Sequence, residues 1–286
     1  MTLSVEGKRI LVTGGSSGIG CAAALALSKA GAEVMLTSRS AERAERVASD
    51  IAAASGRRVI GLRLDLASQA DIRAFADDFQ ARFDRLNVLA NNAGALWTSR
   101  QASPDGYEMT WAVNHLGPML LTSLLLPLLH KSGAARVVTT ASNAHLGGTM
   151  AFDGLGLPDS FSHAGAYGRS KLGNVLFTFA LARRLEGSDA TATCLHPGVV
   201  ATGFFRFIPV VGPMVRVLAT PFLRTPAKGA ETLVWLAGDS EAAGLNGGYF
   251  YDRKPGRLSP LAEDPAVQDR VWDISSKQVG AVWPLR

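Results

Sequence analysis

Cysteine is scarce in this chain of 286 residues, which contains only Cys21 and Cys194. Both stand among apolar neighbours, which suggests buried core positions. Two such residues cannot build a disulfide framework or a thiolate metal site, so the sequence indicates a reducing compartment. His115, His145 and His196 share no metal-ligand spacing, and we expect structural hydrogen bonds for each of them and no metal site.

Uninterrupted apolar runs long enough to cross a membrane are also missing. The longest, residues 116–129 and 210–223, are broken by prolines and are too short to span a bilayer. The first ten residues carry Glu6, Lys8 and Arg9 and have no apolar core of the signal-peptide type. We therefore expect a soluble, cytoplasmic protein, with peripheral contact to a membrane surface left open.

Strong charge clusters are absent as well. The 29 lysines and arginines against 24 acidic residues give a net charge of +5, and the basic residues are scattered. The densest pairs, Arg57-Arg58 and Arg183-Arg184, are expected on solvated helix ends or turns, so we expect no nucleic-acid partner. With 47% hydrophobic residues the chain can bury one large core, and we expect a single domain over residues 1–286.

Short β-rich runs alternate with longer segments rich in Ala, Leu and Arg. This alternation predicts repeated βαβ units, and hence an α/β fold with a doubly wound parallel sheet between two layers of helices. We expect strands at residues 9–13, 33–38, 59–65, 88–92, 136–142, 191–196 and 248–251. We expect helices at about 18–30, 41–55, 68–83, 104–131, 165–186 and 225–238.

The stretch TGGSSGIG at residues 13–20 leads from the first expected strand into the first helix. Unpaired backbone N–H groups and the positive end of the helix dipole in such a turn suit a pyrophosphate. Glycine lets the backbone approach that group closely, although a plain glycine-rich loop would use similar residues. The candidate phosphate-binding residues are Gly14, Ser16, Ser17, Gly18, Ile19 and Gly20.

The second expected strand ends in Ser38 and Arg39, where dinucleotide folds read the adenosine ribose. No acidic side chain stands at this point, and a basic one favours a 2′-phosphate, so we expect NADP(H) in preference to NAD(H). The alternative is that Arg39 is a surface residue that caps the next helix. Asp65 and Leu66 end the third strand, where the carboxylate can bond the adenine edge or cap a helix.

Amide and small side chains follow the fourth expected strand. Asn92, Ala93 and Gly94 can pack closely against a flat cofactor, and a tight turn would use similar residues. Asn114 interrupts the apolar run from residue 111 to 129. A buried amide needs partners, so Asn114 either makes structural hydrogen bonds or contacts a catalytic water.

Tyr167 and Lys171 stand four residues apart on an expected helix and therefore share one face. A nearby ammonium lowers the pKa of a phenol, which makes tyrosine usable as an acid or base near neutral pH. A half-exposed tyrosine beside a solvated lysine is the alternative. Ser142 favours the catalytic interpretation, because it ends the fifth strand at the edge where open α/β sheets bind ligands.

Taken together and in this order, TGGSSGIG, NNAG, Asn114, Ser142 and YGRSK resemble the short-chain dehydrogenase/reductase family. The resemblance covers nearly the whole chain and is closer still to the retinol dehydrogenase-like branch. The interval of 25 residues from Ser142 to Tyr167 is similar to the longer spacing of that branch. Further segments similar to it are residues 113–129, 136–148, 196–205, 225–233 and 270–280.

The resemblance implies a role for each of these residues. Tyr167 would pass a proton to or from the substrate oxygen, and Ser142 would hydrogen-bond that oxygen. Lys171 would lower the pKa of Tyr167 and bond the nicotinamide ribose, and Asn114 would hold a water that links Lys171 to solvent. The residues that match the family's motif after the sixth strand, or flank it, and would contact the nicotinamide are Pro197, Gly198, Val200 and Thr202.

Residues 203–224 are rich in Phe, Val, Met and Leu and contain three prolines. In the family this region forms the substrate lid, so the resemblance implies a lipophilic aldehyde, ketone or alcohol as substrate. Simple packing over the core and shallow membrane contact are the alternatives. A homo-oligomer is left open, since the C-terminal extension at residues 265–286 can pack on its own subunit or line an interface.

The function we expect is NADP(H)-dependent interconversion of a carbonyl and an alcohol. A protein of another class, one that senses NADP(H) with this fold but without turnover, is the alternative. Intact Tyr167, Lys171, Ser142 and Asn114 argue against it, because a sensor has no need of a proton relay.

Overall fold

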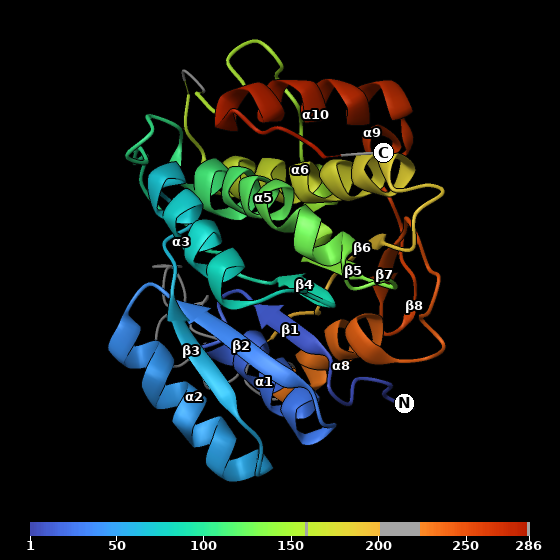
Figure 1. The fold of residues 1–286 in the computed structure, drawn as a ribbon. Helices are drawn as coiled ribbons and strands as arrows, with labels where there is room; N and C mark the ends of the chain where they lie inside the picture. Colours follow the sequence, from blue (N-terminus) through green and yellow to red (C-terminus); the bar gives the residue numbers. More distant parts are fainter. Residues whose placement is uncertain (158–159, 201–223, 285–286) are drawn as a thin grey trace, which may run out of the picture.

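One eight-stranded sheet organises the part of the chain that the computed structural model describes, which is residues 1–157, 160–200 and 224–284. The strands are β1 Arg9–Val12, β2 Glu33–Ser38, β3 Val59–Arg63, β4 Val88–Asn91, β5 Arg136–Thr140, β6 Thr191–Leu195, β7 Tyr249–Tyr251 and β8 Lys254–Pro255. Their order is β3-β2-β1-β4-β5-β6-β7-β8 (Figure 1). The first seven strands are parallel, and β8 pairs with β7 in the antiparallel sense.

Helices cover both faces of this sheet, which makes it the predicted doubly wound Rossmann fold of three layers (Figure 1). One face carries α1 (Gly18–Lys29), α2 (Ala41–Ser55) and α8 (Pro226–Gly238). The other carries α3 (Gln69–Arg82), α5 (Gly117–His130) and α6 (His163–Arg184). β2 and β3 lie on one side of β1, and β4 to β8 lie on the other. The connections on the two sides run in opposite directions, so a crevice forms between β1 and β4 at their carboxyl ends.

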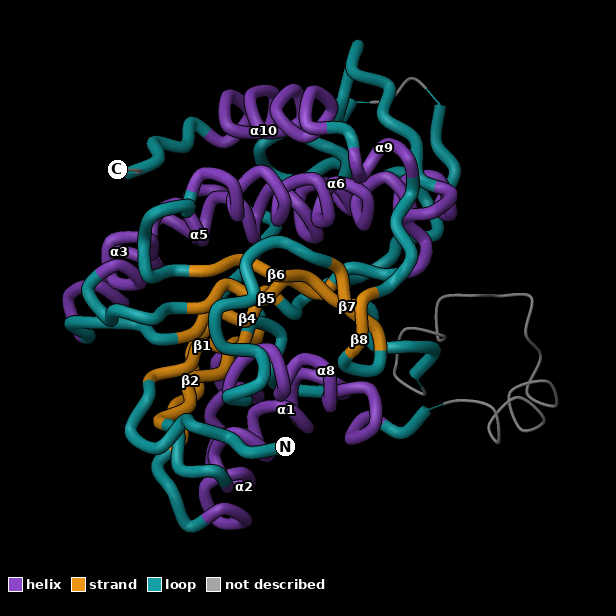
Figure 2. The backbone as a smooth tube through the Cα atoms, turned by 90° about the vertical axis from the view of Figure 1, so that its right-hand side faces the viewer, coloured by secondary structure: helices purple, strands orange, loops and turns teal. Residues whose placement is uncertain are grey.

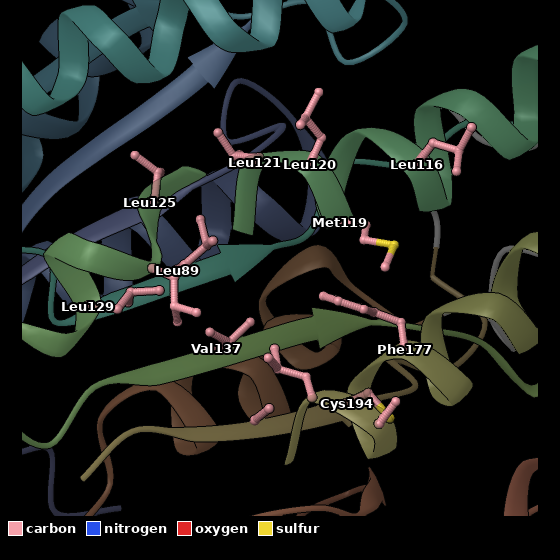
Figure 3. Close-up of a cluster of buried hydrophobic side chains, with 14 of the residues drawn as sticks. Leu89, Leu116, Met119, Leu120, Leu121, Leu125, Leu129, Val137, Phe177 and Cys194 are labelled. Atoms are coloured by element: carbon pink, nitrogen blue, oxygen red, sulfur yellow. The ribbon is translucent and has the colours of Figure 1, made fainter. Parts of the chain in front are cut away.

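The strands are buried on both sides, which explains their nearly continuous apolar sequences. Leu89 and Val137 face the helix layer of α5 and α6, where Phe177 and a row of leucines from α5 cover them (Figure 3). The alternate positions, such as Val88 and Val138, face α1 and α8. Side chains therefore alternate between two hydrophobic clusters along each strand.

The prediction of one continuous helix over residues 104–131 is wrong in its first part. Gly106 takes a φ of 86° in a turn, and the helical region begins only at α4 (Met109–Trp111). The carboxylate of Glu108 caps this start by accepting hydrogen bonds from the next backbone N–H groups. A π-helical turn, η1 (Ala112–Leu116), then leads into α5, next to Pro118, which has no N–H to donate to the preceding turn.

The stretch from Met109 to His130 is long and apolar enough to cross a membrane by length and composition. In the structure, 83% of its most apolar window is buried inside the protein. The core helix of a soluble protein passes the same test, so this stretch is weak evidence for a membrane span.

A short helix α9 (Pro260–Glu263) precedes the last helix, α10 (Pro265–Val279), which lies along the outer side of α6 (Figures 1 and 2). The ring of Trp272 stacks on Phe177 of α6 with 5.8 Å between centroids. Asp269 forms ion pairs with both Arg183 and Arg184, which we had expected on a solvated helix end. Of the C-terminal stretch, α10 thus packs on α6 of the same chain.

The two cysteines differ from the expectation in one respect. Cys194 is fully buried in β6, as expected, whereas Cys21 on α1 is only partly buried. Both are free thiols.

Candidate active site

A cleft of about 870 Å³ opens at the carboxyl ends of the parallel strands. The residues after β1 to β6 supply most of its lining, and α6 supplies Tyr167 and Lys171. The predicted site residues that line it are Gly14, Ser16, Ser17, Gly18, Ile19, Gly20, Arg39, Asp65, Leu66, Asn92, Ala93, Gly94, Ser142, Tyr167, Lys171, Pro197, Gly198 and Val200. Thr202 and residues 203–223 of the expected lid lie outside the described residues.

The hydroxyl of Thr13 joins the glycine-rich turn to the segment after β4. It donates to the carbonyl of Ala90 (3.2 Å) and accepts from the backbone N–H groups of Asn92 and Ala93 (both 3.0 Å). Gly14, with a φ of 63°, passes so close that a Cβ there would lie 2.9 Å from the Cα of Ala93. Glycine is required by this contact and by the positive φ.

Helix α1 begins at the cleft without a side-chain cap. Ser17 holds the N-cap position but makes no side-chain hydrogen bond to the helix. By contrast, the side chains of Ser40, Ser68 and Ser162 cap α2, α3 and α6. The N–H groups in the first turn of α1 are therefore left for a ligand, and their dipole favours an anion.

Two arginines stand at the far end of the cleft. Arg39 is exposed, and Ser40, rather than Arg39, caps α2 by accepting from the N–H of Arg43 (3.1 Å). The guanidinium of Arg43 lies 3.5 Å from the carbonyl oxygen of Ser16 and also lines the cleft. Arg43 is not among the residues predicted from the sequence, although its place in the first turn of the helix after β2 is a signal for it.

Asp65 was expected either to bond the adenine edge or to cap α3, and the structure excludes the cap. The cap of α3 is Ser68, whose hydroxyl accepts from the N–H of Asp71 (3.2 Å). Asp65 instead accepts from the N–H of Ala67 (3.0 Å) in a local turn at the edge of the cleft. Asp65 is therefore not the helix cap.

Tyr167, Lys171 and Ser142 meet at the other end of the cleft. The ammonium of Lys171 donates to the carbonyl of Thr140 (2.9 Å) and lies 5.6 Å from the ring centroid of Tyr167. The side chain of Tyr167 forms a hydrogen bond with Ser142. Ser142 is in turn oriented as the cap of a short 3-10 helix, where its hydroxyl accepts from the N–H of Ala144 (3.2 Å).

Burial controls the protonation of this group. It lowers the pKa of Lys171 to about 8 and raises the pKa of Tyr167 to about 12, and the hydrogen bond with Ser142 acts in the lowering direction on Tyr167. The pKa shift of Tyr167 is thus opposite to the lowering that we expected from Lys171 alone. At neutral pH the phenol holds its proton, so the arrangement suits Tyr167 as an acid.

Asn114 is fully buried in the π-helical turn, where its amide makes structural hydrogen bonds. Its oxygen accepts from the N–H of Ala95 (2.8 Å), and its NH₂ group donates to the carbonyl of Ala95 (2.8 Å) and to the hydroxyl of Ser170 (3.1 Å). A Cβ on Gly94 would lie 3.2 Å from the Lys171 nitrogen and 3.4 Å from the Asn114 oxygen. Asn114 thereby holds the loop after β4 beside Lys171.

The histidines near the site have structural partners or neighbours. His115 shares a hydrogen bond with Ser275 of α10 (2.8 Å), and burial lowers its pKa to about 3. His145 donates from Nδ1 to the carbonyl of Ser142 (2.7 Å), a contact that the sequence did not reveal. The ring of His196 stacks at 5.0 Å on an aromatic ring of β7. Within the described ranges no group of His, Cys, Asp or Glu is arranged to hold a metal ion.

Apolar side chains also line the cleft. Among them are Leu96, Trp97 and Val113, which were not predicted from the sequence. Leu146 and Val199 are exposed, by 38% and 56%. An apolar run directly after the NNAG motif was the available signal for Leu96 and Trp97.

Comparison with known proteins decides the family. The model of the short chain dehydrogenase family matches residues 8–209. The chain belongs to the short-chain dehydrogenase family. This short-chain dehydrogenase is 40% identical to human retinol dehydrogenase 14 over 293 residues, which cover 96% of this chain and 87% of the relative. The family and branch predicted from the motifs are therefore confirmed.

Solved structures agree with this assignment. A crystal structure of an uncharacterized protein from Mycobacterium Paratuberculosis is 30% identical, with a TM-score of 0.79 and coverage of 99% of this chain and 98% of that one. Pseudomonas aeruginosa RhlG in an active-site complex with NADP is 26% identical, with a TM-score of 0.71 and coverage of 93% and 98%. This short-chain dehydrogenase is thus an oxidoreductase that acts on CH–OH and C=O groups.

Proposed function

We propose that this short-chain dehydrogenase uses NADP(H) to interconvert a carbonyl and an alcohol on a lipophilic substrate. The observation that carries the proposal is one continuous cleft with Tyr167, Ser142 and Lys171 at one end and Arg39 and Arg43 at the other. Between the two ends lies the uncapped N-terminus of α1, which fits a pyrophosphate. A nicotinamide dinucleotide with a 2′-phosphate has matching groups in this order.

In the reducing direction the protein's groups act on the substrate oxygen. NADPH, when bound, supplies the hydride. Tyr167, which is protonated at neutral pH, donates its proton to the oxygen as negative charge develops there. Ser142 hydrogen-bonds the same oxygen, and the ammonium of Lys171 stabilises the phenolate that Tyr167 becomes.

For Asn114 we propose a positioning role. Both hydrogens of its amide are engaged, and they tie the loop at Ala95 to Ser170 on α6. This fixes the distance between the segment after β4 and the helix that carries Tyr167 and Lys171. The water contact that the family resemblance implies is not needed for this role.

For the cofactor we propose that Arg39 and Arg43 both bind the 2′-phosphate. β2 ends at Ser38, directly before Arg39, and no acidic side chain stands there to bind ribose hydroxyls. The NADP complex of the relative RhlG is consistent with this choice. Guanidinium groups suit phosphate because their donors form paired, charge-assisted hydrogen bonds.

Charge reversal at these arginines is expected to remove the preference for NADPH. Arg39→Asp and Arg43→Asp should each weaken NADPH binding by about 10- to 100-fold, since a hydrogen bond between charged groups contributes about 1.5–3 kcal/mol. NADH binding should change by less than about threefold, because NADH has no 2′-phosphate. Fluorescence titrations with both cofactors measure the effect. Arg46→Asp on the exposed side of α2 is the matched control, and equal losses for the two cofactors would show that neither arginine reads the phosphate.

For the substrate we propose a lipophilic alcohol, aldehyde or ketone. Leu96, Trp97 and Val113 give the reactive end of the cleft an apolar wall, and Val199 extends it at the surface. The relatives named retinol dehydrogenases are consistent with such a substrate. We further propose a cytoplasmic location, a reducing compartment in which free thiols persist.

The substrate wall makes a prediction about chain length. Trp97→Ala should raise KM about tenfold for a long-chain aldehyde such as decanal, because a large apolar contact is lost. KM for propanal should change by less than about twofold, since a short chain does not reach the ring. Steady-state kinetics with NADPH and both aldehydes test this. The same change in KM for the two aldehydes would exclude Trp97 from the substrate wall.

The first experiment on the function itself is a turnover assay. The purified protein is mixed with NADPH and a panel of lipophilic aldehydes and ketones, and the loss of NADPH absorbance is followed. Turnover of any member supports the proposal. Tight NADPH binding without turnover across the panel would favour a sensing role. The buried Lys171 argues against that role, because burying an ammonium costs free energy and a sensor does not need this group.

A further inference from the structure

The turn between β7 and β8 is strained. Asp252 and Arg253 have φ angles of 50° and 63°, and in the described ranges no other residue besides glycines has a positive φ. The turn joins Tyr251 directly to its partner Lys254, and two-residue hairpins of this kind favour glycine, most strongly at the second position. Because neither residue is glycine, the turn costs free energy that another interaction must offset.

The strained turn presents a carboxylate to one arginine. Both oxygens of Asp252 pair with the terminal nitrogens of Arg224, and the second contact is 2.8 Å long. The same guanidinium donates to the hydroxyl of Tyr251 (2.5 Å) and lies 4.7 Å over its ring. The hydrogen bond from Arg224 lowers the pKa of Asp252, so both partners are charged at neutral pH.

Solvent exposure limits what this ion pair adds to stability. The side chains of Arg224 and Asp252 are 24% and 43% exposed, and solvent weakens even a bidentate pair at such exposure. The strained turn therefore points to a role in positioning as well as in stability.

The ion pair of Arg224 and Asp252 lies against the loop that follows β6. The side chain of Arg224 packs so closely on Gly198 that a Cβ there would lie 2.6 Å from the arginine Cδ. The backbone N–H of Arg224 donates to the carbonyl of Val199 (2.9 Å). On the same side, the ring of Tyr251 stacks on His196 at 5.0 Å. Arg224 thus contacts Gly198 and Val199 of this loop, and Tyr251 of β7 contacts His196.

This loop, residues 196–200, lines the same cleft as Ser142 and Tyr167. Arg224, Tyr251 and Asp252 do not line the cleft as the described residues form it, so they act on the loop and not on a ligand. Gly198 has a φ of 83° and no side chain of its own to fix it, so its conformation depends on what backs it.

We infer that Arg224, Tyr251 and Asp252 are positioning residues that hold loop 196–200 in place for the nicotinamide half of the cofactor. The inference rests on the proposed function, in which this end of the cleft receives the nicotinamide. A loop that binds through its backbone needs support from a neighbouring shell of side chains, because small displacements cost much of the interaction.

Asp252→Gly tests the inference without disturbing the turn, because glycine adopts a positive φ freely. Two probes are titrated: NADPH, and adenosine 2′,5′-bisphosphate, which carries only the adenosine and 2′-phosphate portion. We expect NADPH to bind about tenfold more weakly to the variant, since the nicotinamide contacts loosen. The bisphosphate should bind with unchanged affinity, and the melting temperature should stay close to that of the wild type.

Arg253→Gly is the matched control, since it relieves strain in the same turn and Arg253 is not among the described partners of Arg224. It should raise the melting temperature and leave both affinities unchanged. Asp252→Asn, which also tolerates a positive φ, should weaken NADPH selectively as well.

Two failures are distinguishable. Equal NADPH affinity in the wild type and Asp252→Gly would overturn the inference, as would a parallel loss of both probes together with the melting temperature. A wild-type protein that binds the bisphosphate but not NADPH, or neither, would overturn the proposed function itself.

Discussion

Replacing Tyr167 by phenylalanine is expected to reduce turnover by about 10³-fold or more, because general acid catalysis by a positioned side chain contributes about 10²- to 10⁴-fold. The variant keeps the ring and its packing beside Lys171 and loses only the hydroxyl that hydrogen-bonds Ser142. NADPH affinity should stay within about twofold of the wild type, since Tyr167 acts mainly on the substrate oxygen. Turnover with a competent aldehyde and NADPH titration measure the two quantities.

Tyr107→Phe is the matched control for this experiment. Its hydroxyl donates to the carbonyl of Gln278 (3.2 Å), so the substitution also removes one phenol hydrogen bond, but outside the cleft. We expect its turnover to equal that of the wild type. Retained turnover in Tyr167→Phe would show that another group supplies the proton.

Lys171→Met should separate activity from stability. Lys171 is 2% exposed, and the described hydrogen bond of its ammonium goes to the carbonyl of Thr140. Methionine fills the same space without a charge, so stabilisation of the Tyr167 phenolate is lost and turnover should fall by about 10²- to 10³-fold. The folded protein should nevertheless become more stable at pH 7 by about 2 kcal/mol, the relief of the pKa shift less the loss of one hydrogen bond to the Thr140 carbonyl, which keeps a longer contact from Asn174 (3.4 Å).

The pH dependence of this gain has a definite sign. The pKa of Lys171 falls from 10.5 to about 8 on folding. Below pH 8 both states hold the proton, and the folded protein carries the full cost of the buried charge. Between pH 8 and 10.5 the folded protein releases its proton first, so wild-type stability rises relative to Lys171→Met. Denaturant unfolding of both proteins at pH 7 and pH 10 tests this.

The control here is Lys29→Met, which removes an exposed lysine at the end of α1. It should change neither turnover nor the pH dependence of stability. A Lys171→Met variant that is less stable than the wild type at pH 7 would contradict the idea that the buried charge opposes folding.

The candidate site motifs could be predicted to lie together from the sequence because each stands at a definite place on its element. Ser142 stands two residues after β5 and Tyr167 precedes Lys171 by one helical turn, so the parallel topology alone brings them to one edge. The glycine-rich turn can also be predicted from nearby residues alone, since the positive φ of Gly14 belongs to the turn between β1 and α1. These positions depend on order along the chain and little on packing.

Other parts of the site depend on packing and could not be predicted from the sequence. The pKa of Tyr167 is set by burial, which no motif specifies. Arg43 reaches the cleft only because α2 packs with that side toward Ser16. Arg224 and Asp252 are 28 residues apart in the chain, and the two-residue strand β8 that brings the turn into place has no hydrophobic pattern. Asp65 and Ser68 are equally suited by residue type to cap α3, and only the folded backbone decides for Ser68.

The position of α10 on α6 has a consequence for how the protein is made. The ribosome adds α10 only about 80 residues after α6 is finished, which takes about 4–16 s at 5–20 residues per second. During that interval Phe177 and the neighbouring apolar side chains on α6 lack the cover that Trp272 later provides. The helix that carries Tyr167 is thus fully synthesised before α10 can pack on it. Apolar surface that is exposed during synthesis is prone to aggregation until it is covered.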